Sequence, residues 1–444
     1  MKKLMFILSI LTAHPLFAQI TLKECIESGI LNKANIKSAK LDFLLANLKM
    51  IESKGKYLPQ ISLTYDYRYN PIIATQVVPV GQFNPIPTDE TRAIQFGTNW
   101  QQNAGITLYQ PIIDFSVQSR IKESKLNESL ASVDLVKAES DLTFEIVKTY
   151  SSVLTFSYQV DEAISDTLRS YQSYSIVNSK FIEGKVIKTE VNNALINHNS
   201  NLLNFKKAVS LLINEKIYLY YLTNLDLEKI FDNKFAPIPL SLLDQTTNQG
   251  EIQFESLPEF QRLMIKEQLV NQQIKTERTK YNPTIGFQGF LGANQFSQSF
   301  NPFLSNSWFG NSYVGLAVKL PIFSLEKPIN GSKQLQTQLQ VINFEKEELR
   351  AEKYRSLLQI KLEINKLSEE IKILENSFSL QFENIRLYQD RLQNGQLAAS
   401  GLNIQEAELQ KLSNQLKNLK EQMSKALIER LYIIGNLTSN INTL

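Results

Sequence analysis

The sequence predicts an α+β membrane protein that combines a long α-helical coiled-coil barrel with strands of a transmembrane β-barrel. Three observations favour this fold class. The chain repeats itself in two halves, each half holds two segments of alternating hydrophobicity, and each half ends in long stretches rich in helix-forming residues and almost free of glycine and proline. We therefore expect an internal tandem repeat of strand pairs and helical hairpins.

The N-terminus is typical of a secretory signal peptide. Two lysines follow Met1, an apolar stretch covers 4–11, and Ala18 offers a small residue for cleavage. We therefore expect a signal peptide at 1–18 and an exported protein. The one cysteine, Cys25, cannot form an intramolecular disulfide, and we expect a small buried residue there.

Charge and composition exclude several classes of function. The chain has 47 Lys and Arg against 44 Asp and Glu, so no basic footprint for nucleic acid is visible. Beyond the signal peptide the one histidine is His198, which has no cysteine or second histidine near it in the sequence. We therefore expect no catalytic residues, no metal and no cofactor, and not an enzyme. No run of about 18 apolar residues follows the signal peptide, so a membrane role would depend on strands.

Matched landmarks define the repeat. Three segments of the first half align with three of the second: 57–61 with 281–285, 109–112 with 319–322, and 181–184 with 392–395. The landmarks divide the chain into the signal peptide, a first repeat at 19–222 with its strand pair at 60–110, a linker at 223–257 predicted to form an equatorial belt, and a second repeat at 258–444 with its strand pair at 284–320.

Four segments show the alternation of a strand that has one apolar and one polar face. Such segments of about ten residues are the signature of a transmembrane barrel, weak singly and stronger when they recur in matched places. Trp100, Trp308 and Phe309 near the strand ends suit an aromatic girdle. The stretches that join each pair are rich in Pro, Asn and Ser, and we expect irregular external loops there. The predicted lipid-facing residues are Ile61, Leu63, Tyr65, Ile106, Leu108, Ile285, Phe287, Leu316 and Val318.

Long helices should follow the strand pairs. Pro111 and Gly184 are 73 positions apart, and Pro321 and Gly395 are 74 apart, so both halves hold a rod of one span, on the order of 100 Å at 1.5 Å per residue. Apolar residues recur every seven positions in the last helix, at Leu409, Leu416 and Met423, as in a coiled-coil seam or ordinary helix packing. Shorter helices are predicted at 22–57, 186–222, 258–281 and 397–434.

Four strands cannot close a barrel, and an open edge in lipid would leave backbone groups unsatisfied. The chain should therefore associate. Eight, twelve or sixteen strands would all close in principle, and the residues alone leave this choice open.

Several short motifs resemble those of TolC-like outer-membrane channels, the outer membrane efflux protein family. They are the opening Thr21-Leu22-Lys23-Glu24-Cys25, the strand entry 58–63, the strand exit 110–114, and the turns at 181–184 and 394–395. The similarity covers the whole mature chain and includes the duplication. It implies a homotrimer in which four strands per protomer form one β-barrel and twelve helices form a tapering tunnel.

The resemblance also implies a function. Such a protein is the outer-membrane exit channel of a tripartite efflux pump or a type I secretion system, a passive conduit for small molecules or proteins. It lies in the outer membrane of a Gram-negative bacterium and extends into the periplasm. Its partners are outer-membrane lipid, a periplasmic adaptor (membrane fusion protein) and an inner-membrane pump. A periplasmic coiled-coil adaptor and a structural or adhesin trimer are the alternatives.

The resemblance places candidate sites at the helix tips. The family has Leu-Asp-Val-Leu-x-Ala after the turn glycine of the second coil, where this chain has 402–407, and 189–194 is the equivalent stretch of the first half. We expect pore-constriction residues there, although a charge on a helix is usually a solvated face. Gly184 and Gly395 are expected at helix-ending turns, where an adaptor would dock. The pore-constriction candidates are Glu406, Asn403, Glu190 and Asn193.

Overall fold

The structure, a computed structural model, describes residues 19–80, 85–86, 88–238, 251–301, 303, 308–322, 328–393 and 399–437. The predicted signal peptide at 1–18 lies outside the described residues. In the described part, no helix is both long and apolar enough to cross a membrane. The chain forms two compact units, and each draws segments from both predicted repeats. One unit comprises Met1–Phe43, Ala131–Met264 and Asn343–Leu444, and the other comprises Leu44–Leu130 and Ile265–Ile342.

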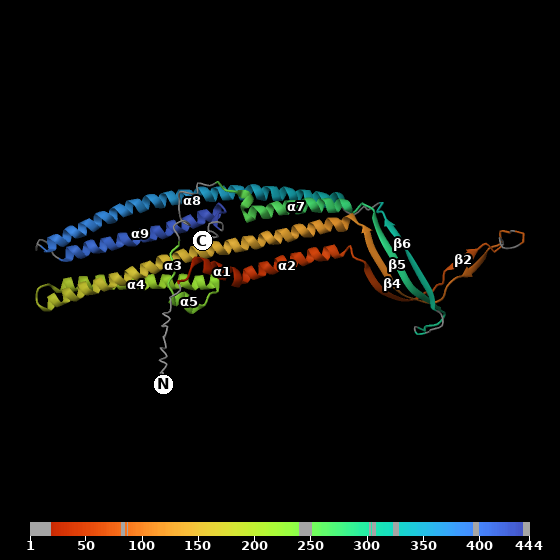
Figure 1. Cartoon of the computed structure of the whole chain (residues 1–444), viewed down its shortest axis with the longest axis horizontal. Coiled ribbons are helices and arrows are strands. Elements are labelled where there is room, and N and C mark those ends of the chain that lie inside the picture. The colour runs from red at the N-terminus through yellow and green to blue at the C-terminus, as the bar shows by residue number, and fades with distance from the viewer. Residues whose placement is uncertain are drawn as a thin grey trace, which may run out of the picture. The chain divides into compact units, whose positions relative to one another are not determined.

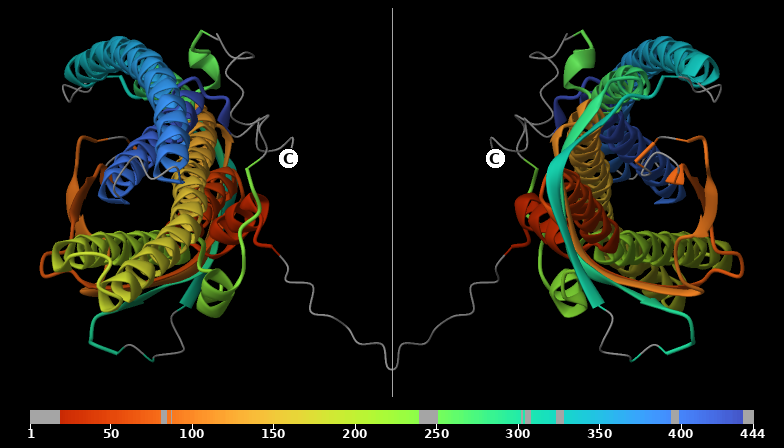
Figure 2. Two further views of the ribbon diagram at one scale, coloured as in Figure 1. Left: turned by 90° about the vertical axis from the view of Figure 1, so that its left-hand side faces the viewer. Right: turned by 90° about the vertical axis from the view of Figure 1, so that its right-hand side faces the viewer.

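The second unit contains a four-stranded antiparallel sheet. Its strands are β1 (Gln60–Tyr69), β4 (Trp100–Ile113), β5 (Thr284–Ser297) and β6 (Trp308–Lys319), in the order β1-β4-β5-β6. The four predicted strands are thus confirmed, and the two pairs lie in one sheet because β4 pairs with β5. Figure 2 shows the strands sweeping in an arc, as expected of twisted strands.

Strand β4 extends beyond its predicted end. The first strand pair was predicted to end at 110, just before Pro111, and proline lacks the N–H that a ladder needs. The strand instead continues to Ile113, and its register with β5 shifts between Pro111 and Ile113. A bulge of this kind is one of the few places where a sheet accepts proline.

The register sorts the strand residues into two faces. Ile61 lies opposite Leu108, which lies opposite Gly289, and Phe287 lies opposite Leu316. Because residues that face each other across a ladder point to the same side, all nine predicted lipid-facing residues share one face, which we call the apolar face. The polar face carries the alternate residues, among them Ser62, Thr64, Asp66, Asn103, Thr107, Gln288, Asn294 and Asn311.

One predicted loop has regular structure. The stretch between β1 and β4 was expected to be irregular because of its prolines. It contains a two-stranded antiparallel ribbon of β2 (Thr75–Val78) and β3 (Arg92–Gln95). The prolines at 71, 79 and 85 lie outside both strands, so they do not interrupt the ribbon's hydrogen bonds.

The predicted helices are present in both halves. In the first half, α3 covers Phe115–Ile182 (68 residues) and α4 covers Lys188–Thr223 (36 residues). In the second, α8 covers Pro328–Gln393 (66 residues) and α9 covers Ala399–Ile433 (35 residues). Helix α7 covers Pro258–Thr279. Figure 1 shows α4 beside α3 and α9 beside α8. The nearly equal lengths confirm the prediction of two matched rods.

Local chemistry sets the helix boundaries. Asp114 caps α3, because its Oδ1 accepts from the backbone N–H groups of Ser116 (2.8 Å) and Val117 (3.2 Å). The first predicted helix is two helices, α1 (Leu22–Asn32) and α2 (Ala34–Gly55), separated by Lys33 in an extended conformation.

The hydrophobic core of the first unit gathers the N-terminal segment, the linker and the long helices. Ile20 forms a parallel bridge with Phe235, and the Tyr150 hydroxyl lies 2.8 Å from the Ile20 carbonyl oxygen and 2.7 Å from that of Ala236. Helix α5 (Leu227–Asp232) and the 3-10 helix η2 (Phe254–Ser256) each add a buried residue to this core. Cys25 is fully buried, as predicted, and burial raises the pKa of its thiol to about 12.

Candidate functional site

The tip of the first hairpin is a glycine turn. Gly184 has φ +72° and donates its N–H to Phe181 O (2.9 Å), while Lys185 donates to Lys180 O (2.8 Å). This pair of bonds is the Schellman motif, which ends a helix at a residue of left-handed conformation. The prediction that Gly184 ends its helix at positive φ is confirmed. Ile182 and Ile187 on either side of the turn are exposed.

The candidates of the first tip lie next to a buried stripe of α4. Val191 and Ala194 are buried, whereas Glu190 is half-buried and Asn193 is exposed. Glu190 occupies the first turn of α4, where a carboxylate interacts favourably with the helix dipole.

The structure describes the second tip in part. Gly395 and the Asn403 side chain lie outside the described residues. Glu406 is exposed on the surface of α9, but desolvation by the surrounding protein raises the pKa of its carboxyl above the usual range, and Arg169 of α3 opposes that rise. Glu406 therefore lies near a cation of the first hairpin, a neighbour that the sequence did not predict.

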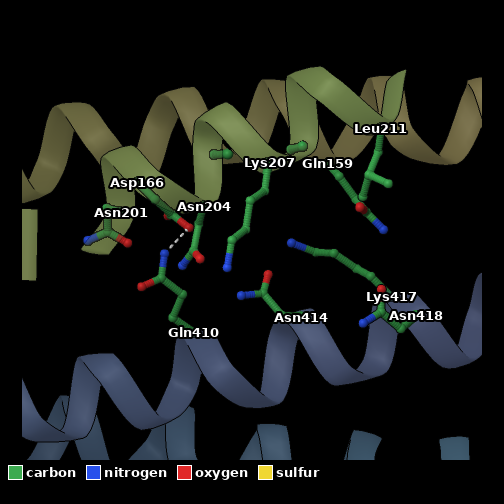
Figure 3. Close-up of a pocket in the computed structure, with 12 residues that line it drawn as sticks. Gln159, Asp166, Asn201, Asn204, Lys207, Leu211, Gln410, Asn414, Lys417 and Asn418 are labelled. Carbon is green, nitrogen blue, oxygen red and sulfur yellow. Dashed lines mark hydrogen bonds between the residues drawn. The ribbon is translucent and has the colours of Figure 1, made fainter. Parts of the chain in front are cut away.

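A ladder of polar contacts joins α3 to α9, and Figure 3 shows one of its steps, between Asp166 and Gln410. Gln410 Nε2 donates to Asp166 Oδ2 (2.5 Å), and Asp166 also forms an ion pair with Arg169. About one turn further along, Ser413 Oγ donates to Glu162 Oε1 (3.3 Å), and Lys417 forms an ion pair with the same carboxylate. The ladder joins the two hairpins through polar and charged side chains, which can also form hydrogen bonds with water.

A polar cavity of about 160 Å³ lies beside this ladder, between α3, α4 and α9. Asn201 lines it with 5% of its surface exposed, and its Oδ1 has no hydrogen-bond partner among the described residues. Gln159 Nε2 lacks one there too. A cavity this large and polar has room for water molecules that would bind these amides. Lysines and amides form most of the rest of its lining: Asn204, Lys207, Gln410, Asn414, Lys417 and Asn418.

Sequence reasoning missed the ladder. Its signal was the spacing of positions 162, 166 and 169 on one helix and 410, 413 and 417 on the other, which places polar side chains on one face of each. That spacing does not say which helices meet. In the described part of the chain no group of three or more His, Cys, Asp or Glu side chains could hold a metal ion.

A four-stranded antiparallel sheet combined with two long helical hairpins of equal span defines a class of protein, and the fold is that of the TolC-like outer-membrane channels. The CmeC outer membrane channel of Campylobacter jejuni has 16% sequence identity and a TM-score of 0.70, over 95% of this chain and 88% of that one. VceC, an outer membrane protein of Vibrio cholerae, has 12% identity and a TM-score of 0.69, over 93% and 96%. The open state of the MtrE outer membrane channel of Neisseria gonorrhoeae has 14% identity and a TM-score of 0.68, over 94% and 89%.

No protein-family model and no protein of curated function matches the sequence. The solved structures alone confirm the resemblance to TolC-like channels, and they confirm it for the fold.

Proposed function

We propose that this chain is one protomer of a homotrimeric outer-membrane channel, a passive exit duct for small molecules or proteins. The solved structures that share its fold include outer membrane channels. In this proposal three sheets of four strands close into one barrel, and the helical hairpins form a tunnel that extends into the periplasm of a Gram-negative bacterium. The residues supply the conduit, and the energy for transport comes from a partner.

The single observation that carries the proposal is the sheet. Its apolar face is exposed on all four strands, for example at Leu63 (80%), Ile106 (48%), Leu291 (67%) and Leu316 (66%). Each edge strand, β1 and β6, pairs with one neighbour among the described strands. An apolar face is stable in lipid, but an unpaired edge there costs several kcal/mol for each unsatisfied group. Joining the β6 edge of one copy to the β1 edge of the next pairs both edges and removes this cost.

A stripe on α8 supports the association of copies. Ile373, Leu380 and Leu387 recur every seven residues and are 65%, 55% and 50% exposed. Heptad-spaced apolar residues pack against a neighbouring helix in coiled coils. We assign this stripe to the contact with the next protomer. The resemblance to TolC-like channels favours three copies over two or four.

The proposal extends to partners and to the entrance. A periplasmic adaptor would dock at the helix tips marked by Gly184 and Gly395, and an inner-membrane pump of an efflux or type I secretion system would supply the energy. Glu406, Asn403, Glu190 and Asn193 would line the narrow entrance. The exposed Ile182 and Ile187 beside the Gly184 turn give an adaptor apolar anchors at that tip.

The two alternatives fit the fold less well. An adaptor predicts one helical hairpin flanked by compact β domains, whereas the described residues form two hairpins and one four-stranded sheet. A coiled-coil adhesin would explain the helices but not a sheet with one apolar face.

The proposal is tested by purifying the protein from outer membranes in mild detergent, determining its mass, and recording conductance in a planar bilayer. We expect a trimer that conducts ions. A water-soluble monomer without conductance would overturn the proposal.

A pair of neighbouring residues sharpens the test. Leu63 lies on the apolar face and Thr64 on the polar face, so Leu63→Lys should prevent stable insertion whereas Thr64→Lys should be tolerated. A lysine at the middle of the lipid face of a barrel costs about 2–4 kcal/mol. The measurement is the amount of each variant in the outer-membrane fraction. Equal amounts would contradict the assignment of the two faces.

A further inference from the structure

The polar face of the sheet carries aromatic side chains on three of its four strands. Tyr109 of β4, Phe290 of β5 and Tyr313 of β6 belong to this face by register, since Phe290 lies opposite both Thr107 and Tyr313. Tyr109 is 40% and Tyr313 51% exposed, and Phe290 is half-buried. Phe296 and Phe309 lie on the same face nearer its end, with ring centroids 6.2 Å apart. A face of this kind usually carries small and polar residues, so the three rings in its middle call for an explanation.

Glycines hold the Phe290 ring against the sheet. A Cβ atom placed on Gly105 would come within 2.5 Å of Phe290 Cε2 and Cζ, and one on Gly292 within 2.6 Å of Cζ. Gly105 and Gly292 are direct partners across β4 and β5, so they leave a notch in the polar face that the ring fills. Side chains at either position would force the ring away from the sheet.

The other rings extend this arrangement. Tyr313 stacks with Phe290, with ring centroids 5.9 Å apart and planes 22° apart, so the two nearly parallel rings form one aromatic platform. Tyr109 lies over a third glycine, Gly286, whose Cβ would come within 2.6 Å of Tyr109 Cε2. Aromatic rings that lie down over glycines take little space from a lumen and offer their free sides to it.

Among the described residues, the middle of the polar face around this platform carries no charged side chain. Among the described residues of the polar face, the charged side chains are Asp66 and Arg68, which pair with each other near one end, and Lys319 at the other end. Recognition at the platform would therefore depend on ring stacking and not on ion pairing.

We propose that Tyr109, Phe290 and Tyr313 form an aromatic track on the wall of the lumen, and that the track retains cargo that carries a flat aromatic ring system. This inference rests on the proposed function, because the polar face must line the lumen. Offset stacking on a fixed ring is favourable for any flat aromatic partner. Three protomers would place three such tracks around one passage, so that a passing ring always has one within reach.

The test compares two monovalent cations as blockers of single-channel current. The flat aromatic 9-aminoacridine should reduce the current at lower concentration than tetraethylammonium, which has the same charge and no ring. In the double variant Phe290→Leu/Tyr313→Leu, the concentration of 9-aminoacridine needed for half block should rise about five- to 150-fold, because two stacking contacts are lost. Block by tetraethylammonium should not change.

Two further variants keep the result interpretable. Phe287→Leu changes an aromatic residue of the apolar face of the same strand and should leave block by both cations unchanged. Tyr313→Leu alone changes an exposed side chain and should fold even if the double variant does not.

A conducting double variant, or a conducting Tyr313→Leu variant, that is blocked like wild type would overturn the track and leave the channel intact. Wild-type protein without conductance would overturn both.

Discussion

The long helices of the two halves have nearly the same length but differ in how they are buried. Within the first unit, α3 has four fully buried residues, Ile146, Val147, Tyr150 and Val153, in the hydrophobic core. Helix α8 has no residue at 0% exposure among those described and buries one stripe in this core, with Ile364 and Leu367 among its members; both helices also expose large apolar residues, such as Leu168 of α3 and Ile373 of α8.

The two repeats therefore share the length of their long helices but not the segments that pack against those helices. Helix α3 contacts the N-terminal segment, the linker and α9, because Tyr150 reaches Ile20 and Ala236 while Glu162 and Asp166 reach α9. Helix α8 leaves an apolar stripe without cover in one protomer. If the chain assembles as proposed, α3 stabilises the protomer and α8 joins it to the next.

The largest effect should come from charges on the α8 stripe. The double variant Ile373→Lys/Leu380→Lys would place two ammonium groups of each protomer in an apolar contact, and their desolvation costs several kcal/mol. We expect the trimer to dissociate, as measured by light scattering in detergent. Ser368→Lys adds a charge to an exposed position on a different side of α8 and should leave the trimer intact. A double variant that stays trimeric would show that this stripe is not the contact.

The next effect concerns the core around α3. Ile146→Ala should lower the free energy of unfolding by about 2–5 kcal/mol, because it opens a cavity at a fully buried position. Leu168→Ala on the same helix removes a side chain that is 59% exposed and should change stability by about 0.5 kcal/mol or less. Urea unfolding of the two variants measures the difference. Equal losses would refute the view that α3 forms the core of the protomer.

A smaller difference in stability is expected between substitutions at two glycine turns. Gly184 ends helix α3, and Gly435 ends helix α9. Gly184 (φ +72°) has open space around it, whereas a Cβ on Gly435 (φ +81°) would come within 2.9 Å of Cδ2 of the buried Leu257. Gly184→Ala should cost about 1–2 kcal/mol from the left-handed conformation alone. Gly435→Ala should cost more, because Leu257 must also move. Thermal unfolding checks this order, and a reversed order would mean that Leu257 adjusts freely.

Much of the fold could be predicted because its elements have strong local signals. Alternation gave the strands, their two faces and the matched positions of each pair, and the scarcity of glycine and proline gave the long helices. The pairing of β4 with β5 was beyond such signals, because it joins segments almost 200 residues apart and depends on which sheet edges meet. The break at Lys33 and the bulge after Pro111 were missed for a related reason, since tertiary packing overrides local preference there.

The candidate site was predicted unevenly. Gly184 could be placed because a helix-ending turn requires a left-handed residue, and glycine is suited to that conformation. The ladder of Asp166 with Gln410 and of Glu162 with Ser413 could not, because polar residues on a helix surface look alike until the facing helix is known. The roles of Glu406 and Glu190 at an entrance remain predictions, and the two residues differ in a way that can be tested.

Glu406 and Glu190 should respond oppositely to neutralisation. Desolvation raises the pKa of Glu406 in the folded protein, so its contribution to stability is full below the unfolded pKa of about 4.3 and is lost as pH rises through the folded pKa. Glu406→Gln should therefore raise stability at neutral pH and flatten the pH dependence in that window. Glu190→Gln removes a carboxylate from the first turn of α4 and should lower stability by about 0.3–1 kcal/mol. Thermal unfolding between pH 4 and pH 7 distinguishes the two signs.

The same two variants test the entrance. A carboxylate at a constriction raises the local concentration of cations, so each substitution should lower the preference for cations over anions, measured from the reversal potential in a salt gradient. The stability changes arise within the protomer, whereas the change of preference requires that the side chain face the lumen. A variant that alters stability but not the reversal potential would therefore assign its carboxylate to the protein surface, and Glu406, with Arg169 close by, is the residue for which this separation matters most.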